Sequence, residues 1–182
     1  MFFRSSTYKE NSTKHKTKEI DMTATATQQT LVIPENEVEF ALALNGDEAD
    51  PIEMLQNDGI NPANWEFRGK KIMGTGTRRR FKLVSVGYCT SFNKLVEKLK
   101  KQGAIPEGQW REAFKKRFPK PGEKSLIGFA DASWVYPNAD LYFPYFGDNG
   151  GRNSSFRWTG HGFNGVWRWV VEVSESAPSA TI

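Results

Sequence analysis

Aromatic side chains are the feature of this sequence that most limits its fold. The chain of 182 residues has 6 Trp, 5 Tyr and 13 Phe, and half of these rings fall between Phe129 and Trp169. Hydrophobic residues make up only 38% of the chain, so these large side chains must supply much of the core. The sequence therefore predicts one folded domain and excludes whole-chain disorder, a coiled coil and a transmembrane helix.

The two ends of the chain differ in composition from the middle. Residues 1–30 are rich in Ser, Thr, Lys and Gln and contain few branched apolar side chains, so they cannot offset the entropy lost on ordering. We therefore expect a disordered polar tail over 1–30, a single globular domain over 31–174 and a flexible tail over 175–182. Met22 is an alternative start, because the composition changes after it.

Two helices are expected near the middle of the domain. Phe92, Leu95 and Leu99 recur at helical spacing, which predicts an amphipathic helix over Phe92–Lys101. A second helix is expected over Glu107–Phe118, where Trp110, Phe114 and Phe118 lie on one side. The short connection between them predicts a helical hairpin. Upstream, Asp50 and Pro51 have the residue types of an N-cap and a first helical position.

From residue 125 the hydrophobic period changes to two, which is typical of strands. In the last of these segments Trp167, Trp169 and Val171 lie on one face and Arg168 and Glu172 are among the residues on the other, as in an antiparallel sheet with one covered face. Pro144 cannot donate a main-chain hydrogen bond and predicts an edge position for its strand. The expected fold is α+β: a mainly antiparallel sheet packed on one face by the two-helix hairpin, with an aromatic-rich C-terminal meander.

Several short motifs occur in a recognisable order. Val84-Ser85-Val86-Gly87-Tyr88 is followed by the helix from Phe92, the Pro106-Glu107 start, Ile127-Gly128 and the closing Trp-Val pattern. Over about residues 80–175 this order resembles a small uncharacterised bacterial domain. The resemblance supports the α+β fold and implies no activity.

Charges are segregated along the chain, although the net charge is only +4. Residues 35–66 contain nine acidic and no basic side chains, whereas residues 68–82 contain seven basic and no acidic ones. These blocks either pair with each other in the fold or leave a basic face open to a partner.

A basic surface is the first candidate for function. It combines the triple arginine with a lysine stripe at helical spacing; its residues are Arg78, Arg79, Arg80, Lys82, Lys94, Lys98 and Lys101. Such a surface suits nucleic acid or an acidic protein surface as partner, and nothing in the sequence points to a membrane. We therefore expect a small interaction module that binds rather than catalyses.

Exposed aromatic rings give an alternative function, because rings on a sheet can stack on sugar faces. The residues of this alternative carbohydrate-binding surface are Trp134, Tyr136, Trp158 and Trp167. The competing interpretation is that these rings form the core, which a chain poor in aliphatic residues needs.

A hydrolase that uses Cys89 as nucleophile and His161 as base is the third hypothesis. A small buried Cys and a tight glycine loop around His161 explain the same residues without catalysis. The sequence predicts no cofactor and no metal site. A single Cys and the lack of an apolar signal segment favour a cytoplasmic location.

Overall fold

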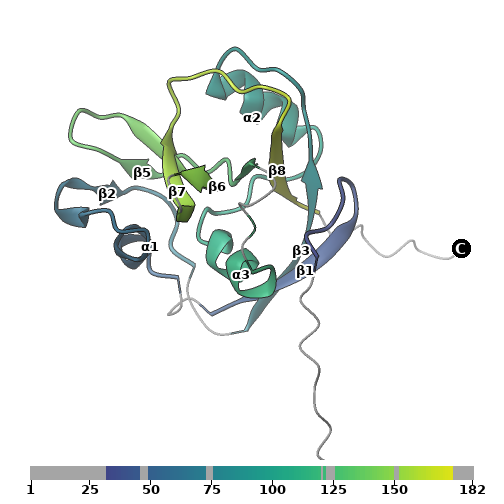
Figure 1. Ribbon diagram of the computed structural model, residues 1–182, viewed down its shortest axis with the longest axis horizontal. Coiled ribbons are helices and arrows are strands. Elements are labelled where there is room, and N and C mark those ends of the chain that lie inside the picture. The colour runs from purple at the N-terminus through teal and green to yellow at the C-terminus, as the bar shows by residue number, and fades with distance from the viewer. Residues whose placement is uncertain are drawn as a thin grey trace, which may run out of the picture.

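The computed structural model describes residues 32–45, 49–72, 76–119, 121, 126–149 and 152–173 (Figure 1). The polar tails expected over 1–30 and 175–182, and the choice between Met1 and Met22 as the start, lie outside these residues. Within the described part of the chain, no helix has both the length and the apolar character needed to cross a membrane.

The described residues form one sheet of eight strands with helices on its two faces. The strands are β1 (Glu39–Leu44), β2 (Glu66–Phe67), β3 (Thr77–Val84), β4 (Leu126–Gly128), β5 (Trp134–Val135), β6 (Leu141–Asn149), β7 (Arg152–Trp158) and β8 (Trp167–Glu172). The helices are α1 (Pro51–Asn57), the short 3₁₀ helix η2 (Pro62–Asn64), α2 (Phe92–Lys100) and α3 (Trp110–Arg117). The predicted α+β class is confirmed.

The strand order is β1-β3-β8-β4-β6-β5-β2, and β7 pairs with β6. Among these strands every pairing is antiparallel except that of β4 with β8. The aromatic-rich strands β5, β6 and β7 form a meander, as expected, but β8 leaves this order and inserts between β3 and β4. Because Trp167 and Trp169 on one face of β8 and Val170 on the other are all buried, β8 fits a central position better than an edge.

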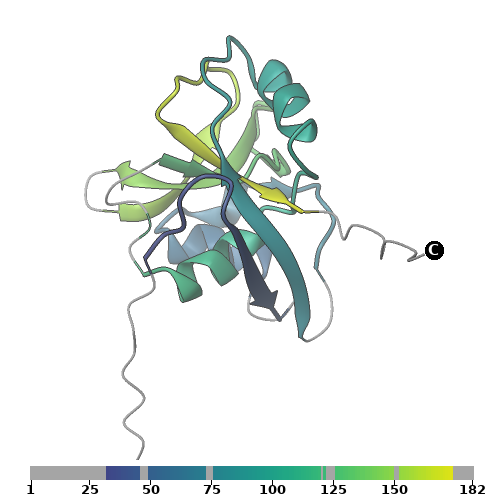
Figure 2. The same cartoon turned by 90° about the vertical axis from the view of Figure 1, so that its right-hand side faces the viewer.

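The two main helices do not form a hairpin on one face of the sheet. Leu95 and Leu99 of α2 pack with Trp169 and Val171, whereas α3 packs with Val170. Successive side chains of a strand point to opposite faces, so α2 and α3 cover opposite faces of β8. Figures 1 and 2 show the helices on different sides of the strands.

The connection between the helices explains this difference from the expected arrangement. Ala104 exchanges two main-chain hydrogen bonds with Glu172, at 3.0 and 2.8 Å. The pairing of β4 with β8 ends at Trp169, so the side of β8 beyond that point is open to the connection. The chain therefore passes from one face to the other beside Glu172, a crossing that helical periodicity cannot reveal.

Helix starts follow from local sequence where tertiary contacts do not compete. Asp50 caps α1 by accepting hydrogen bonds from the amides of Ile52 and Glu53, as its sequence context predicts. The start of α3 falls at Trp110 rather than Glu107. The Glu107 carboxylate is bonded to Arg79 and Trp110. The Gly108 amide donates to Asp131, so this turn serves long-range contacts.

The prediction that Pro144 marks an edge strand is wrong, because β6 lies between β7 and β4. The carbonyl oxygen of Pro144 accepts a hydrogen bond from the Phe129 amide, on the side of β6 that faces β4. The imide nitrogen of an extended residue faces the same side as its carbonyl. Since β4 ends at Gly128, the ladder there does not require a donor from residue 144.

Candidate binding site

The antiparallel pairing of β1 with β3 brings the acidic and basic blocks of the sequence together. Glu39 lies opposite Lys82 in the register, and its carboxylate accepts from Arg80 Nη1 at 3.2 Å. The Lys82 Nζ atom pairs with Glu37 at 2.7 Å. Part of the predicted basic surface is therefore compensated inside the fold.

Arg79 has a structural role. Its Nη1 atom lies 3.0 Å from a carboxylate oxygen of both Glu107 and Glu172, and its guanidinium lies 5.4 Å from the centre of the Trp110 ring. These contacts join β3, β8 and the turn before α3. The side chain is 30% exposed, so these two carboxylates compete directly with any anionic ligand for Arg79.

The lysines predicted at helical spacing also differ in their contacts. Lys98 Nζ donates to the carbonyl oxygens of Val86 and Tyr88, both at 3.0 Å, and so fixes the loop that precedes α2. Lys94 and Lys101 are exposed. Lys101 lines a hollow together with Lys82, but Glu39 lines it too. Arg78, Arg79 and Arg80 line another hollow together with Glu172. The predicted residues therefore do not form one continuous basic surface, and carboxylates line both of these hollows.

Arg78 differs from the other predicted arginines. It is exposed, and within the described part of the chain it makes no ion pair. Together with Lys116 and Arg117 of α3 it lines a groove of about 330 Å³ beside β1. The other lining residues are Ala41, Leu42, Ala43, Asn45 and Ala113. Three of these described lining residues are basic and none is a carboxylate.

The groove runs along a free strand edge. In the described sheet β1 is terminal and pairs with β3 alone. The Ala41 carbonyl accepts a hydrogen bond from Arg117 Nη1, so the main-chain groups of Ala41 point away from β3. Because these groups alternate in direction along a strand, those of Glu39 and Ala43 face outward too. The groove thus combines cationic side chains with main-chain donors and acceptors.

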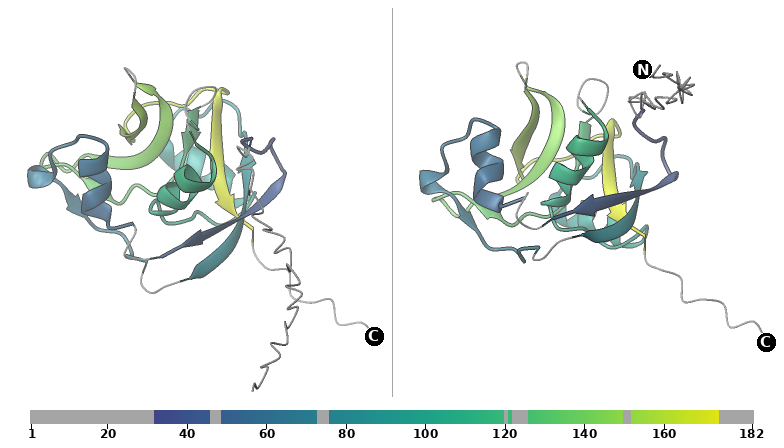
Figure 3. Two further views of the ribbon diagram at one scale, coloured as in Figure 1. Left: turned by 60° about the horizontal axis from the view of Figure 1, so that its bottom comes forward. Right: turned by 90° about the horizontal axis from the view of Figure 1, so that it is seen from below.

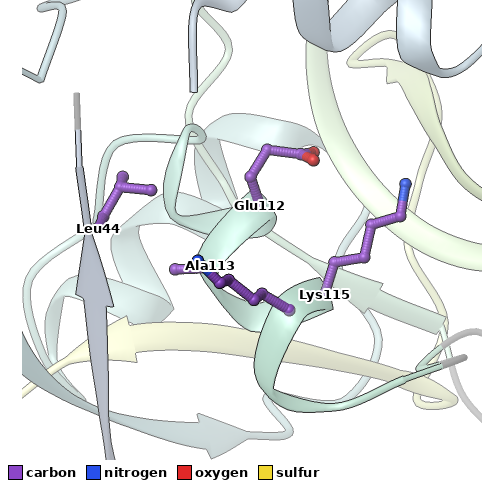
Figure 4. Close-up of a pocket in the computed structure, with 5 residues that line it drawn as sticks. Leu44, Glu112, Ala113 and Lys115 are labelled. Atoms are coloured by element: carbon purple, nitrogen blue, oxygen red, sulfur yellow. The ribbon is translucent and has the colours of Figure 1, made fainter. Parts of the chain in front are cut away.

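A second hollow, of about 280 Å³, continues the groove past Ala113 and Lys116 (Figure 4). Figure 4 shows Glu112 and Lys115 projecting from α3 while Leu44 comes from β1. The Glu112 carboxylate accepts two hydrogen bonds from the buried guanidinium of Arg111, at 3.0 and 2.9 Å. This carboxylate is therefore already paired with a cation.

Sequence reasoning found Arg78 but missed Lys116 and Arg117. The run Lys115-Lys116-Arg117 is visible in the sequence and forms the last turn of α3, where basic side chains also suit the helix dipole. Its importance depends on α3 lying against β1, and nothing in the sequence shows that contact.

The four rings of the alternative aromatic surface are divided between the core and the surface. Trp134 and Trp167 are buried in the core, so the expectation that they form an exposed platform is wrong. Trp134 donates its indole N–H to the Pro51 carbonyl at 2.9 Å, which explains how this polar ring can be fully buried. Tyr136 and Trp158 are partly exposed, at 38% and 37%.

The structure does not support the pairing of Cys89 with His161. The Cys89 thiol is buried in the cluster that contains Leu95 and Leu99. The His161 ring is exposed and lies edge-on to the Trp158 ring, with centroids 4.9 Å apart. Main-chain hydrogen bonds between Cys89 and Phe163 bring the two loops together. The Cys89 side chain is nonetheless only 2% exposed and packs in the core.

No family model, curated protein or solved structure matches this chain. Among the surfaces described above, the groove between β1 and α3 is the candidate site that the structure supports best, because it combines basic side chains with a free strand edge.

Proposed function

We propose that this protein is a small interaction module that binds an acidic, extended segment of a partner protein in the groove between β1 and α3. The observation that carries the proposal is the lining of this groove. Arg78, Lys116 and Arg117 surround the free edge of β1, and the described lining residues include no carboxylate.

A free strand edge recognises a peptide through its main chain. An extended segment added beside β1 would pair with the outward groups of Glu39, Ala41 and Ala43, and the small alanine side chains leave space beside it. Arg117 now occupies the Ala41 carbonyl. On binding, the incoming amide would replace this donor, and Arg117 would turn to a carboxylate of the partner.

An acidic protein segment fits the structure better than nucleic acid does. Binding of a phosphate backbone requires a run of available cations. Arg79, Arg80 and Lys82 are paired with carboxylates of the same chain, and the lysines of α2 belong to the opposite face of the sheet. Beside β1, Arg78, Lys116 and Arg117 line a short groove with a peptide-like edge. We also propose a cytoplasmic location for the module, since its single Cys89 is kept as a buried thiol.

The test uses a fluorescein-labelled heptapeptide of alternating Glu and Val, titrated with the full chain and followed by fluorescence anisotropy. A matched peptide with Gln in place of Glu reports on charge. We expect the Glu peptide to bind more tightly, and its affinity to fall at least about threefold between roughly 50 and 300 mM NaCl.

Variants locate the binding surface. The double variant Arg78→Ala/Lys116→Ala is expected to weaken binding about threefold to tenfold, whereas the matched pair Lys94→Ala/Lys101→Ala on α2 leaves it unchanged. Amide shifts in NMR spectra should map to Ala41 and Ala43. Equal binding of the Glu and Gln peptides, or no amide shifts along β1 at millimolar peptide, would show that Arg117 and its neighbours only protect the edge from self-pairing. Binding of oligo-dT in place of the peptide, lost in Arg78→Ala/Lys116→Ala, would replace the proposal with a nucleic-acid interface.

A further inference from the structure

The edge of the sheet opposite β1 carries a different kind of hollow. It has a volume of about 320 Å³ and lies between η2 with β2 on one side and β5 with its following turn on the other. Its lining residues are Ala63, Asn64, Trp65, Glu66, Arg68, Val135, Tyr136, Pro137 and Ala139. Figures 1 and 3 show β2 on the far side of the molecule from β1, so this hollow is separate from the basic groove.

Two aromatic rings form part of the lining. Trp65 and Tyr136 have ring centroids 5.2 Å apart at an interplanar angle of 60°. Trp65 also packs against Tyr142, at 4.8 Å between centroids, and against Phe156. These contacts fix the indole, which remains partly exposed, and Tyr136 is 38% exposed. The hollow therefore offers apolar ring surface in a fixed position.

The polar side chains of the hollow are arranged as a neutral set. Arg68 Nε and Nη2 both donate to Glu66 Oε2, at 2.9 and 2.7 Å. This bonding leaves Glu66 Oε1 and the remaining guanidinium N–H groups directed to solvent or a ligand. The hydrogen bonds from Arg68 also lower the pKa of Glu66, so its carboxylate stays ionised. Asn64 adds an exposed amide that can both donate and accept.

The backbone that holds these groups is already ordered. The Asn61 side chain caps η2 by accepting from the Ala63 amide at 3.0 Å. Beyond β5, the Tyr136 amide donates to the Asp140 carbonyl at 3.0 Å, and the Ala139 amide donates to the Tyr136 carbonyl at 2.8 Å. A ligand that binds here therefore meets preformed walls, which reduces the entropy lost on binding.

We infer that this hollow binds a neutral saccharide unit. Sugar rings present apolar C–H faces that stack on aromatic rings, here Trp65 and Tyr136. Their vicinal hydroxyls both donate and accept hydrogen bonds, which suits the Asn64 amide and the Glu66–Arg68 pair. The volume lies at the lower end of the range for small-ligand sites, so it fits one or two sugar units of a longer chain.

The neutral lining of the hollow favours a saccharide over a nucleic acid as its ligand. Glu66 and Arg68 neutralise each other, so the hollow has no excess of positive charge to attract a phosphate backbone. Stacking on Trp65 and Tyr136 is common to bases and sugars, but only the sugar matches a neutral, hydroxyl-binding set of polar groups.

The test uses saturation-transfer NMR with the full chain and four neutral hexasaccharides: cellohexaose, laminarihexaose, maltohexaose and chitohexaose. We expect at least one of them to bind with a millimolar or lower Kd, with the strongest transfer to the C–H protons of one sugar face. Raising NaCl from about 50 to 500 mM should leave the Kd unchanged, because no ionic contact is gained or lost.

Variants test whether the sugar binds in this hollow. Tyr136→Ala and Asn64→Ala remove exposed side chains and should each weaken binding about fivefold or more. Tyr88→Ala removes an exposed tyrosine from another part of the surface and is the matched control. The absence of transfer to all four sugars at millimolar concentration, or binding that Tyr136→Ala and Asn64→Ala leave intact, would overturn the inference. So would binding of oligo-dT that competes with the sugar and weakens with salt.

The proposed sugar-binding hollow and the proposed peptide groove can be tested independently of each other. Arg78→Ala/Lys116→Ala should leave sugar binding unchanged, and Tyr136→Ala should leave peptide binding unchanged. The failure of one proposal can therefore be distinguished from the failure of the other.

Discussion

Replacement of Arg111 with Met tests how α3, which carries two of the three basic side chains of the groove, is held in place. The Arg111 and Asp58 side chains are fully buried, and Arg111 Nη1 lies 2.6 Å from Asp58 Oδ2. The same atom donates to the Ser155 carbonyl at 3.1 Å, and Ser154 donates to Asp58 Oδ1 at 2.5 Å. These bonds connect α3 with the end of α1 and with β7.

The expected loss follows from the burial of this pair. Removal of one partner of a buried ion pair leaves an uncompensated charge and costs about 3–5 kcal/mol. Met keeps the length of the side chain and part of its packing on the Phe156 ring, which lies 4.8 Å from the guanidinium. We therefore expect Arg111→Met to lower the free energy of unfolding by about 3–5 kcal/mol. Asp58→Asn should cost less, because Arg111 retains Glu112 as a counter-ion.

Urea denaturation at pH 7, followed by tryptophan fluorescence and circular dichroism, measures these differences. The double variant Arg111→Met/Asp58→Asn should lose less stability than the sum of the single variants, because the two residues contact each other. Arg80→Met breaks a half-exposed pair with Glu39 and is the control, with an expected loss of at most about 1 kcal/mol. A loss for Arg111→Met as small as that of the control would refute the argument from burial. If Arg111→Met is too unstable to purify, Arg111→Lys keeps the charge and should show a smaller loss.

Three further predictions concern the core and its buried groups. A Cβ at Gly128 would overlap the Trp169 ring, so Gly128→Ala should lower stability by about 1–3 kcal/mol in urea titrations. Burial raises the pKa of Asp131, against hydrogen bonds from Gly108 and Ser133. Ionisation of Asp131 therefore opposes folding. The protonated side chain contributes stability at low pH, and this stability is lost as the pH rises from the ordinary pKa of aspartate through the raised pKa of Asp131 in the folded protein. Asp131→Asn should remove this slope from stability measured against pH; an unchanged slope would contradict the assignment. The Cys89 thiol is buried, so it should react with a disulfide reagent only after denaturation; fast reaction of the native protein would show that it is accessible.

The groove between β1 and α3 depends on tertiary contacts that the sequence does not show. Arg78 is predicted from the triple arginine, but the other two arginines of that run are paired with Glu39, Glu107 and Glu172 through strand register and the turn before α3. Lys116 and Arg117 became part of a site only because α3 packs beside β1. Similarly, the tyrosine of the second hollow was predicted, whereas Trp65 was not, because its position depends on the pairing of β2 with β5.

Local interactions determined what the sequence by itself could specify. The period of Leu95 and Leu99 specifies α2, Asp50 and Pro51 specify the start of α1, and the aromatic excess after Phe129 specifies how the core is filled. These features depend on neighbours within a few residues along the chain. Tertiary structure decided the insertion of β8 between β3 and β4, the passage of the chain beside Glu172 to the other face, and hence which charges are paired and which line a groove. Each of these depends on which distant main-chain edges meet, and a hydrophobic period carries no information about that choice.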